Sequence, residues 1–143
     1  MIKIKLARTI KGKDYIKEME KEYGSMKKFK KLLNEGKGDM KLELDLENWE
    51  YLTDNPDEKL EQEVILYDEN PSFTMTDLKI LDLIKNEKPE SITQLAVMMG
   101  KDSGNVAKQV NKLKEKGFIE LKEGKINNMK TPIFNYDKIE IAI

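Results

Sequence analysis

The sequence predicts an α+β protein, on the strength of three patterns along its 143 residues. Apolar and charged residues alternate near both ends, with the period of a half-buried strand. Between residues 75 and 116 apolar residues recur every three to four positions, with the period of helices that bury one face. A glycine-marked turn follows the last of these helices and separates two short strand patterns. Helices combined with a β-hairpin are therefore expected.

The composition is that of a globular protein with a strongly charged surface, since 37% of residues are charged and 38% are hydrophobic. The apolar runs are far shorter than the roughly 20 residues that a membrane-spanning helix needs. The N-terminus lacks the continuous apolar stretch and the small-residue cleavage site of a signal peptide. We therefore expect a cytoplasmic protein that does not enter a membrane.

Residues that support catalysis are scarce, because the chain has no cysteine and no histidine. Disulfides, thiol nucleophiles, zinc fingers and imidazole acid–base chemistry are thereby excluded. Neighbouring carboxylates such as Asp45 with Glu47 are common on surface helices, and no glycine-rich phosphate loop is present. We therefore expect no enzyme activity, no cofactor and no metal site.

The net charge of −1 hides three segments of different sign. Residues 1–37 hold twelve basic and five acidic residues, a net charge of +7. Residues 38–71 hold two basic and twelve acidic residues, a net charge of −10. Residues 72–143 hold twelve lysines and ten acidic residues, a net charge of +2. Eight of these lysines lie within residues 101–130. Because the local field on a docking face governs binding to phosphates, the near-neutral total does not argue against nucleic acid.

The first part of the chain predicts a strand followed by a helix. Apolar residues alternate with lysine over residues 2–6, so one side of an extended strand would be apolar. The helix is expected over residues 14–33, where apolar residues have helical spacing, with a kink or break at Gly24-Ser25.

The middle of the chain predicts a second strand and a short helix. Leucines alternate with acidic residues over residues 42–46, and a helix would follow over residues 47–52. Residues 58–70 fit a strand as well as a helix, and we interpret their start as a helix. The turn sequence at residues 70–72 then closes an N-terminal α/β extension of residues 1–71.

Residues 72–143 are expected to form a separate domain that opens with three helices. Their apolar spacing predicts helices over residues 75–86, 91–99 and 102–116. Gly100 stands where a left-handed C-cap is needed, so a short turn would join the second helix to the third. This is the geometry of a helix-turn-helix.

A β-hairpin is expected over residues 118–136, after the third helix. Residues 118–121 predict a strand and residues 123–124 a turn. Lys125 and Lys130 would lie near the tip, where the wing of a winged helix-turn-helix meets backbone phosphates. The alternative is an ordinary hairpin whose lysines maintain solubility.

The third helix is the candidate for reading DNA. Asparagine and glutamine side chains bond adenine in the major groove, and lysine reaches phosphate or guanine. The alternative is an ordinary solvated helix surface. The polar residues predicted to point away from the core are Ser103, Asn105, Lys108, Gln109 and Lys112.

Several short motifs span this domain: Lys88-Pro89-Glu90-Ser91-Ile92, Gln94-Leu95-Ala96, Gly100-Lys101-Asp102, Asn105-Val106, Lys116-Gly117-Phe118-Ile119 and Tyr136-Asp137-Lys138-Ile139-Glu140-Ile141. In this order they resemble the MarR-type winged-helix transcription factors, over roughly residues 74–143. The resemblance implies that Lys101 joins the recognition-helix surface and that Lys125 and Lys130 occupy the wing. Gly104 departs from the pattern and removes a phosphate contact that a basic residue would make.

We therefore predict sequence-specific binding of double-stranded DNA by a transcription regulator. The recognition helix, residues 102–116, would enter the major groove, and the wing, residues 118–136, would lie on the backbone. Such proteins usually dimerise, so a homodimer is expected. The terminal strands and the apolar stripe of the first helix would supply its interface. The alternatives are that these surfaces complete the core of one chain, or that the terminal strands pair within it.

The alternative function is a protein-interaction or antitoxin-like module built on the same fold. A protein partner would then bind through residues 1–71, with the acidic segment 38–71 docking a basic surface. Otherwise that segment is a solvated face. Strong salt-dependent DNA binding would separate the two functions.

Overall fold

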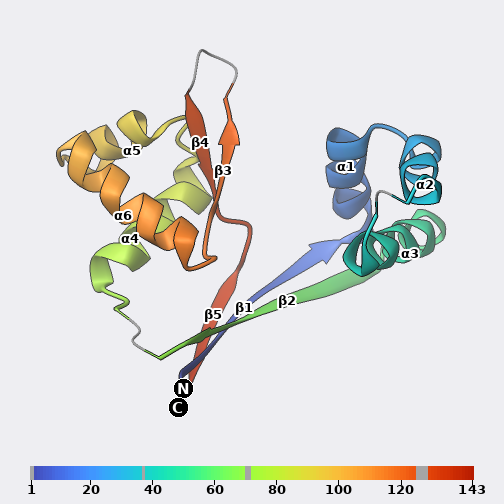
Figure 1. Ribbon diagram of the computed structural model, residues 1–143, viewed down its shortest axis with the longest axis horizontal. Helices are drawn as coiled ribbons and strands as arrows, with labels where there is room; N and C mark the ends of the chain where they lie inside the picture. Colours follow the sequence, from blue (N-terminus) through green and yellow to red (C-terminus); the bar gives the residue numbers. More distant parts are fainter. Residues whose placement is uncertain (1, 37, 70–71, 125–128) are drawn as a thin grey trace. The chain divides into compact units, whose positions relative to one another are not determined.

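The computed structural model describes residues 2–36, 38–69, 72–124 and 129–143. It combines helices with small antiparallel sheets, so the predicted α+β class is confirmed (Figure 1). No helix among the described residues is both long and apolar enough to cross a membrane. In chain order the elements are β1 (Ile2–Lys11), α1 (Gly12–Tyr23), α2 (Met26–Asn34), α3 (Met40–Asp54), β2 (Lys59–Asp68), α4 (Met75–Glu87), α5 (Ile92–Met99), α6 (Ser103–Glu115), β3 (Glu120–Glu123), β4 (Lys130–Ile133) and β5 (Lys138–Ala142).

The chain forms two compact units. Unit 1 comprises Met1–Arg8 and Glu63–Ile143, and unit 2 comprises Thr9–Gln62. This division differs from the boundary between residues 71 and 72 that the sequence suggested. The reason is strand pairing, because β1 joins β2 and β5 in one sheet and so brings the first strand into the unit that holds residues 138–142.

The three-stranded sheet of unit 1 has the strand order β2-β1-β5. β5 runs antiparallel to β1, with Lys3 opposite Ala142 and Leu6 opposite Ile139. The two terminal strands therefore pair within one chain, as one of the sequence alternatives proposed. Ile4 and Leu6 are buried in the core of the unit. The apolar face of β1 therefore packs within the same chain and is not available to a partner.

Lys5 links all three strands of this sheet. Its ammonium lies 3.4 Å from Glu63 Oε1 on β2 and 3.3 Å from Glu140 Oε2 on β5. The hydrogen bonds to Glu140 and Glu63 raise the pKa of Lys5, and those from Lys138 and Lys5 lower the pKa of the Glu140 carboxyl. These opposite charges on neighbouring strands add favourable cross-strand interactions to the sheet.

The three helices of unit 1 begin at polar residues that cap them. Thr74 and Asp77 form a reciprocal capping box at the start of α4. Ser91 caps α5, Gly100 ends it in the left-handed conformation with φ of 65°, and Asp102 caps α6. These signals are local in the sequence. The predicted helix bounds are therefore confirmed to within one residue at each end.

One apolar core joins these helices to the sheet and to the hairpin. α6 contributes Val106, Val110 and Leu113, which recur at i, i+4 and i+7 and so face the same way. This packing fixes which side of α6 is exposed. The buried residues of the core are Ile4, Leu6, Ile80, Leu81, Ile84, Leu95, Ala96, Met99, Val106, Val110, Leu113, Phe118, Ile119 and Phe134.

β3 and β4 form the antiparallel hairpin expected after α6. β3 begins at Glu120, whereas the sequence predicted a strand from residue 118. The Phe118 amide donates a hydrogen bond to the Leu113 carbonyl at 3.0 Å and thereby closes the end of α6. Phe118 is thus part of the helix terminus and starts no strand. Residues 125–128, where the tip was predicted, lie outside the described residues.

Unit 2 contains α1, α2 and α3 with the adjoining ends of β1 and β2. Its own core is formed by Tyr15, Met19, Phe29, Trp49 and Leu52, which come from all three helices. The Tyr15 hydroxyl donates to the Asp45 carbonyl oxygen at 3.1 Å, so the buried ring has a partner for its polar atom. The apolar stripe of the first helix was one candidate for the dimer interface. It is instead packed within the core of unit 2 of the same chain.

The helix predicted over residues 14–33 is broken where the sequence indicated. Gly24 adopts φ of 81°, a conformation that suits glycine, and α1 ends at the preceding residue. The Ser25 hydroxyl then accepts a hydrogen bond from the Lys28 amide at 3.1 Å and caps α2. The predicted break is thus confirmed as a boundary between two helices.

The strand predicted over residues 42–46 is wrong, because this segment is the first half of α3. Asp39 caps the helix by accepting a hydrogen bond from the Leu42 amide at 3.0 Å. Leu42, Leu46 and Trp49 have helical spacing and contribute to the core, whereas Leu44 is 55% exposed. Leu44 completes the apparent alternation in the sequence, but it is not among the residues that form this core. The predicted helix over residues 47–52 is the second half of α3.

The helix favoured at the start of residues 58–70 is also wrong, because β2 occupies Lys59–Asp68. The ten-residue strand β1 is its partner, and the Gly12 amide donates to the Glu58 carbonyl at 2.7 Å where the pair ends. This segment is therefore a strand because it pairs with β1, some 50 positions away in the sequence.

Candidate nucleic-acid interface

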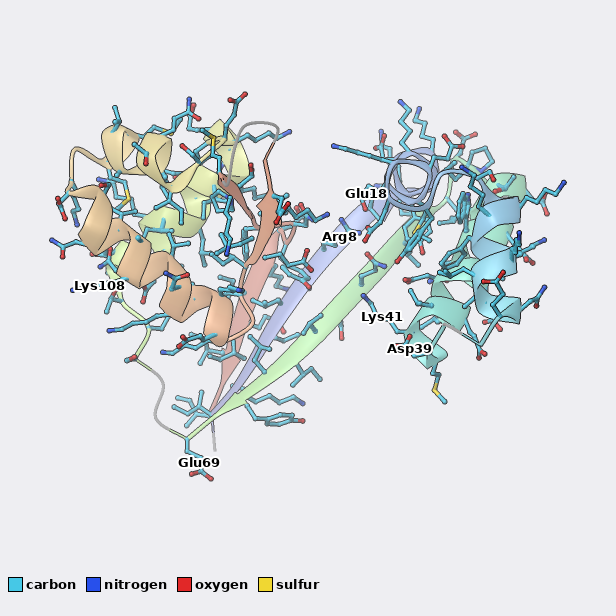
Figure 2. The ribbon with its side chains drawn as sticks, turned by 45° about the horizontal axis from the view of Figure 1, so that its top comes forward. Arg8, Glu18, Asp39, Lys41, Glu69 and Lys108 are labelled. Carbon is cyan, nitrogen blue, oxygen red and sulfur yellow. The ribbon has the colours of Figure 1, made fainter. Side chains whose placement is uncertain are left out.

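An exposed polar stripe runs along α6 on the side opposite its buried residues. Asn105, Lys108 and Lys112 recur at i, i+3 and i+7, and all three are exposed. Figure 2 labels Lys108 on the outer side of the helix. Because Val106 and Val110 anchor α6 in the core, the direction of this stripe is fixed by packing.

The other residues predicted on the recognition helix do not all belong to this stripe. Gln109 is half-buried and lies at its border. At about 100° per residue, Ser103 lies on the opposite side of α6 from Lys112, although it is exposed. Lys101 is exposed in the turn before α6, and its amide donates to the Ala96 carbonyl at 3.1 Å. The structure therefore groups Asn105, Lys108 and Lys112 and leaves Ser103 apart.

A carboxylate occupies the N-terminus of α6. Asp102 Oδ2 accepts a hydrogen bond from the Asn105 amide at 3.1 Å, so one of the free amides of the first turn already has a partner. A negative charge at this end is favourable to the helix and unfavourable to an approaching phosphate. The exposed positive charges of the helix lie further along, at Lys108 and Lys112 in its second and third turns. The sequence allowed either Asp102 or Ser103 as the cap, and the structure selects Asp102.

A side-chain hydrogen bond joins the hairpin to the helices, in addition to the apolar packing of Leu121 and Phe134 on the core of unit 1. The Thr131 hydroxyl on β4 donates to the Glu90 carbonyl at 2.7 Å, in the turn between α4 and α5. Lys130, a predicted wing residue, is exposed at the start of β4 and lies opposite Glu123. Lys122, exposed on β3 and opposite Thr131, is a second lysine of the hairpin. Lys125 lies outside the described residues.

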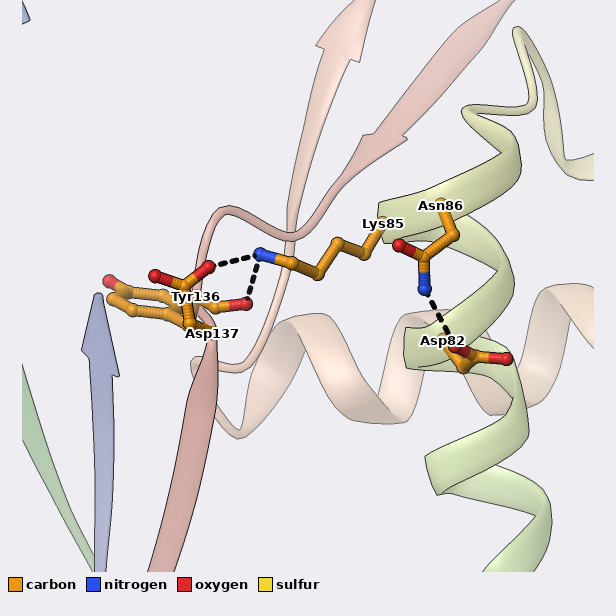
Figure 3. A network of polar contacts seen from close by, with 5 residues as sticks. All are labelled: Asp82, Lys85, Asn86, Tyr136 and Asp137. Carbon is orange, nitrogen blue, oxygen red and sulfur yellow. Dashed lines mark hydrogen bonds and ion pairs between the residues drawn. The ribbon is translucent and has the colours of Figure 1, made fainter. Parts of the chain in front are cut away.

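Lys85 joins α4 to the segment that leads from the hairpin into β5. Its ammonium donates to the Tyr136 carbonyl at 2.6 Å and to Asp137 Oδ1 at 2.7 Å, as Figure 3 shows. Beside it on α4, Asn86 Nδ2 donates to Asp82 Oδ1 at 2.7 Å. Burial raises the pKa of the Tyr136 hydroxyl above its ordinary value. These residues line a surface hollow of about 440 Å³. The two bonds of Lys85 hold the segment just before β5 against α4.

Unit 1 thus combines three helices and a two-stranded hairpin with an exposed polar stripe on the last helix. The sequence model of a family described as HVO_A0114 matches residues 72–141, from just before α4 into β5. The chain is similar to that family over this segment. No curated protein and no solved structure matches the chain.

Proposed function

We propose that the protein binds double-stranded DNA in a sequence-specific manner and regulates transcription, with unit 1 acting as a winged helix-turn-helix domain of the MarR type. The observation that carries this proposal is the exposed stripe of Asn105, Lys108 and Lys112 on the third helix of unit 1. An amide and two ammonium groups at this spacing suit base edges and phosphates in a major groove.

The short, capped turn before α6 supports the proposal. Gly100 and Asp102 define the short connection between α5 and α6, and both helices are packed in the core of unit 1. A reading helix must hold its side chains in one geometry before it meets the DNA, because ordering them on binding costs affinity. The hairpin lysines Lys122 and Lys130 would lie on the backbone next to the groove, as a wing does.

The test is a titration of the purified protein with duplexes selected from a random library, compared with scrambled duplexes over 50 to 200 mM salt. We expect selected sequences to bind at least about 1000-fold more tightly than scrambled ones. The logarithm of the binding constant should fall linearly with the logarithm of salt, by about 0.9 for each phosphate contacted. Absence of duplex binding at the lowest salt would contradict the proposal and favour the protein-interaction module.

We also propose that the protein is a homodimer. The core-facing residues of β1 are buried within one chain, but β2 lies at the edge of the described sheet and carries Ile65 and Tyr67, which are 41% and 65% exposed. Ile141 on β5 is exposed as well. Light scattering is expected to give a mass near twice the 16.7 kDa of one chain, and Tyr67→Lys should shift it towards the monomer. A single-chain mass at all concentrations would contradict this interface.

A further inference from the structure

The helix α2 of unit 2 carries a concentration of positive charge that the proposed function does not use. Its nine residues include Lys27, Lys28, Lys30 and Lys31 and no acidic residue. All four lysines are exposed. The adjacent helix α3 has the opposite character, with one lysine and five carboxylates. Charge is therefore sorted between two neighbouring helices of one small unit.

The four lysines lie on one face of α2. At about 100° per residue they span an arc of roughly 160°, which also includes Asn34. The opposite arc is apolar, with Phe29 buried against Trp49 and with Leu32 and Leu33 packed on the same core. Packing of this apolar face turns the lysines outward. Together with Ser25, Met26 and Asn34, the lysines line an open surface hollow of about 740 Å³.

Most of this charge is not neutralised within the chain. Lys30 lies 3.4 Å from Glu50 Oε1 on α3. Across the ranges that the structure describes, Lys27, Lys28 and Lys31 form no ion pair. Three like charges within five residues repel one another, and an external polyanion would relieve that repulsion.

We infer that this lysine face binds the phosphate backbone of duplex DNA and adds a sequence-independent contact to that of α6. The inference rests on the proposed function, since it assigns a second surface to the same ligand. Lysine is a flexible point charge that suits phosphate, and interfaces with DNA are far more positive than interfaces between proteins. In an open hollow, three unneutralised lysines thus fit a backbone that carries one charge per ~1.7 Å of helix axis.

Two other polyanions fit this face less well. Lysine is depleted at protein interfaces, whose affinity comes from buried aromatic and arginine anchors, and the exposed face of α2 has neither. A helix that binds an anionic membrane needs an apolar face to insert among the lipids. The apolar face of α2 is occupied by the core of unit 2, as Phe29 shows with 1% exposure.

The test uses the full chain with the triple substitution Lys27→Gln/Lys28→Gln/Lys31→Gln. The matched control is Lys13→Gln/Lys17→Gln/Lys21→Gln on α1, which removes the same charge from the same unit but among Asp14, Glu18, Glu20 and Glu22. Binding to selected and scrambled duplexes is measured by fluorescence anisotropy over a salt series. Circular dichroism and the fluorescence of Trp49 report whether each variant is folded.

We expect the α2 variant to bind both duplexes at least about tenfold more weakly at 50 mM salt, with an unchanged ratio between them. Its salt slope should fall by about 2 to 3, since each lost phosphate contact accounts for roughly 0.9. The α1 variant should retain a slope close to that of the native protein. An equal effect of both triple variants would mean that only net charge matters and would overturn the inference.

Two further outcomes separate this inference from the proposed function. If the native protein binds DNA through α6 while the α2 variant keeps the native slope, the inference alone is overturned. If the native protein binds no duplex, both proposals fail. A last measurement uses vesicles of phosphatidylserine and phosphatidylcholine. If the α2 variant loses vesicle binding but keeps native DNA binding, the lysine face binds lipid and the inference is overturned.

Discussion

Replacing Lys108 and Lys112 together with alanine is expected to weaken binding to a selected duplex by about 10- to 1000-fold at low salt. Both side chains are exposed on the outward stripe of α6, and each would lose a contact to a phosphate or to a guanine edge. A base contact contributes about 1 to 3 kcal/mol of discrimination, and 1.4 kcal/mol corresponds to a factor of ten. Anisotropy titration against selected and scrambled duplexes measures both affinity and specificity.

The matched control for this experiment is Lys79→Ala/Lys114→Ala, which removes the same charge from exposed positions outside the stripe. Lys114 lies on α6 itself, but roughly 120° or more around the helix from Lys108 and Lys112. We expect this control to bind nearly as well as the native protein. Because Lys79 lies on α4, equal losses in the two variants would show that binding follows the overall charge of unit 1, and they would contradict the role of α6 as a reading helix.

Truncation of a core leucine is expected to destabilise only the unit that contains it. Leu52 in unit 2 and Leu113 in unit 1 are each 2% exposed, and the two cores share no residue. Leu52→Ala and Leu113→Ala should each cost about 2 to 5 kcal/mol, because the loss of buried apolar contact adds to the cost of a cavity. Such a loss is a large part of the stability of a small domain.

Trp49 makes the two effects separable, since it is the only tryptophan and lies in the core of unit 2. In urea titrations, Leu52→Ala should lower the midpoint seen by tryptophan fluorescence. Leu113→Ala should leave that midpoint near the native value and lower the stability of the remaining helical signal in circular dichroism. A common shift of both signals in each variant would show that the units unfold as one.

The helices of unit 1 were predictable from sequence because their determinants lie within each helix. Ser91, Gly100 and Asp102 are capping residues that act over three or four positions, and the apolar stripe of α6 needs only its own spacing. The same local reasoning gave the polar stripe of the candidate site. It also included Ser103, because a list of polar residues does not show on which side of the helix each one lies.

The N-terminal half was predicted less well, because its structure depends on contacts between distant segments. Alternating leucines over residues 42–46 are compatible with both a strand and a helix, and the core around Trp49 selects the helix. β2 forms because β1 is there to pair with it, which no pattern within residues 58–70 reveals. The lysine face of α2 was visible only as an excess of positive charge, since its direction depends on the burial of Phe29.

The pairing of β1 with β5 has a consequence for the order in which the two units form during synthesis. Lys3 lies opposite Ala142, so Lys3 pairs only after a residue about 140 positions later has been made. All of unit 2, Thr9–Gln62, has been synthesised long before that point. Its core can therefore assemble on the ribosome, whereas the sheet of unit 1 closes only after residues 138–142 have emerged. Until then Ile4 and Leu6 lack the part of their packing that β5 supplies.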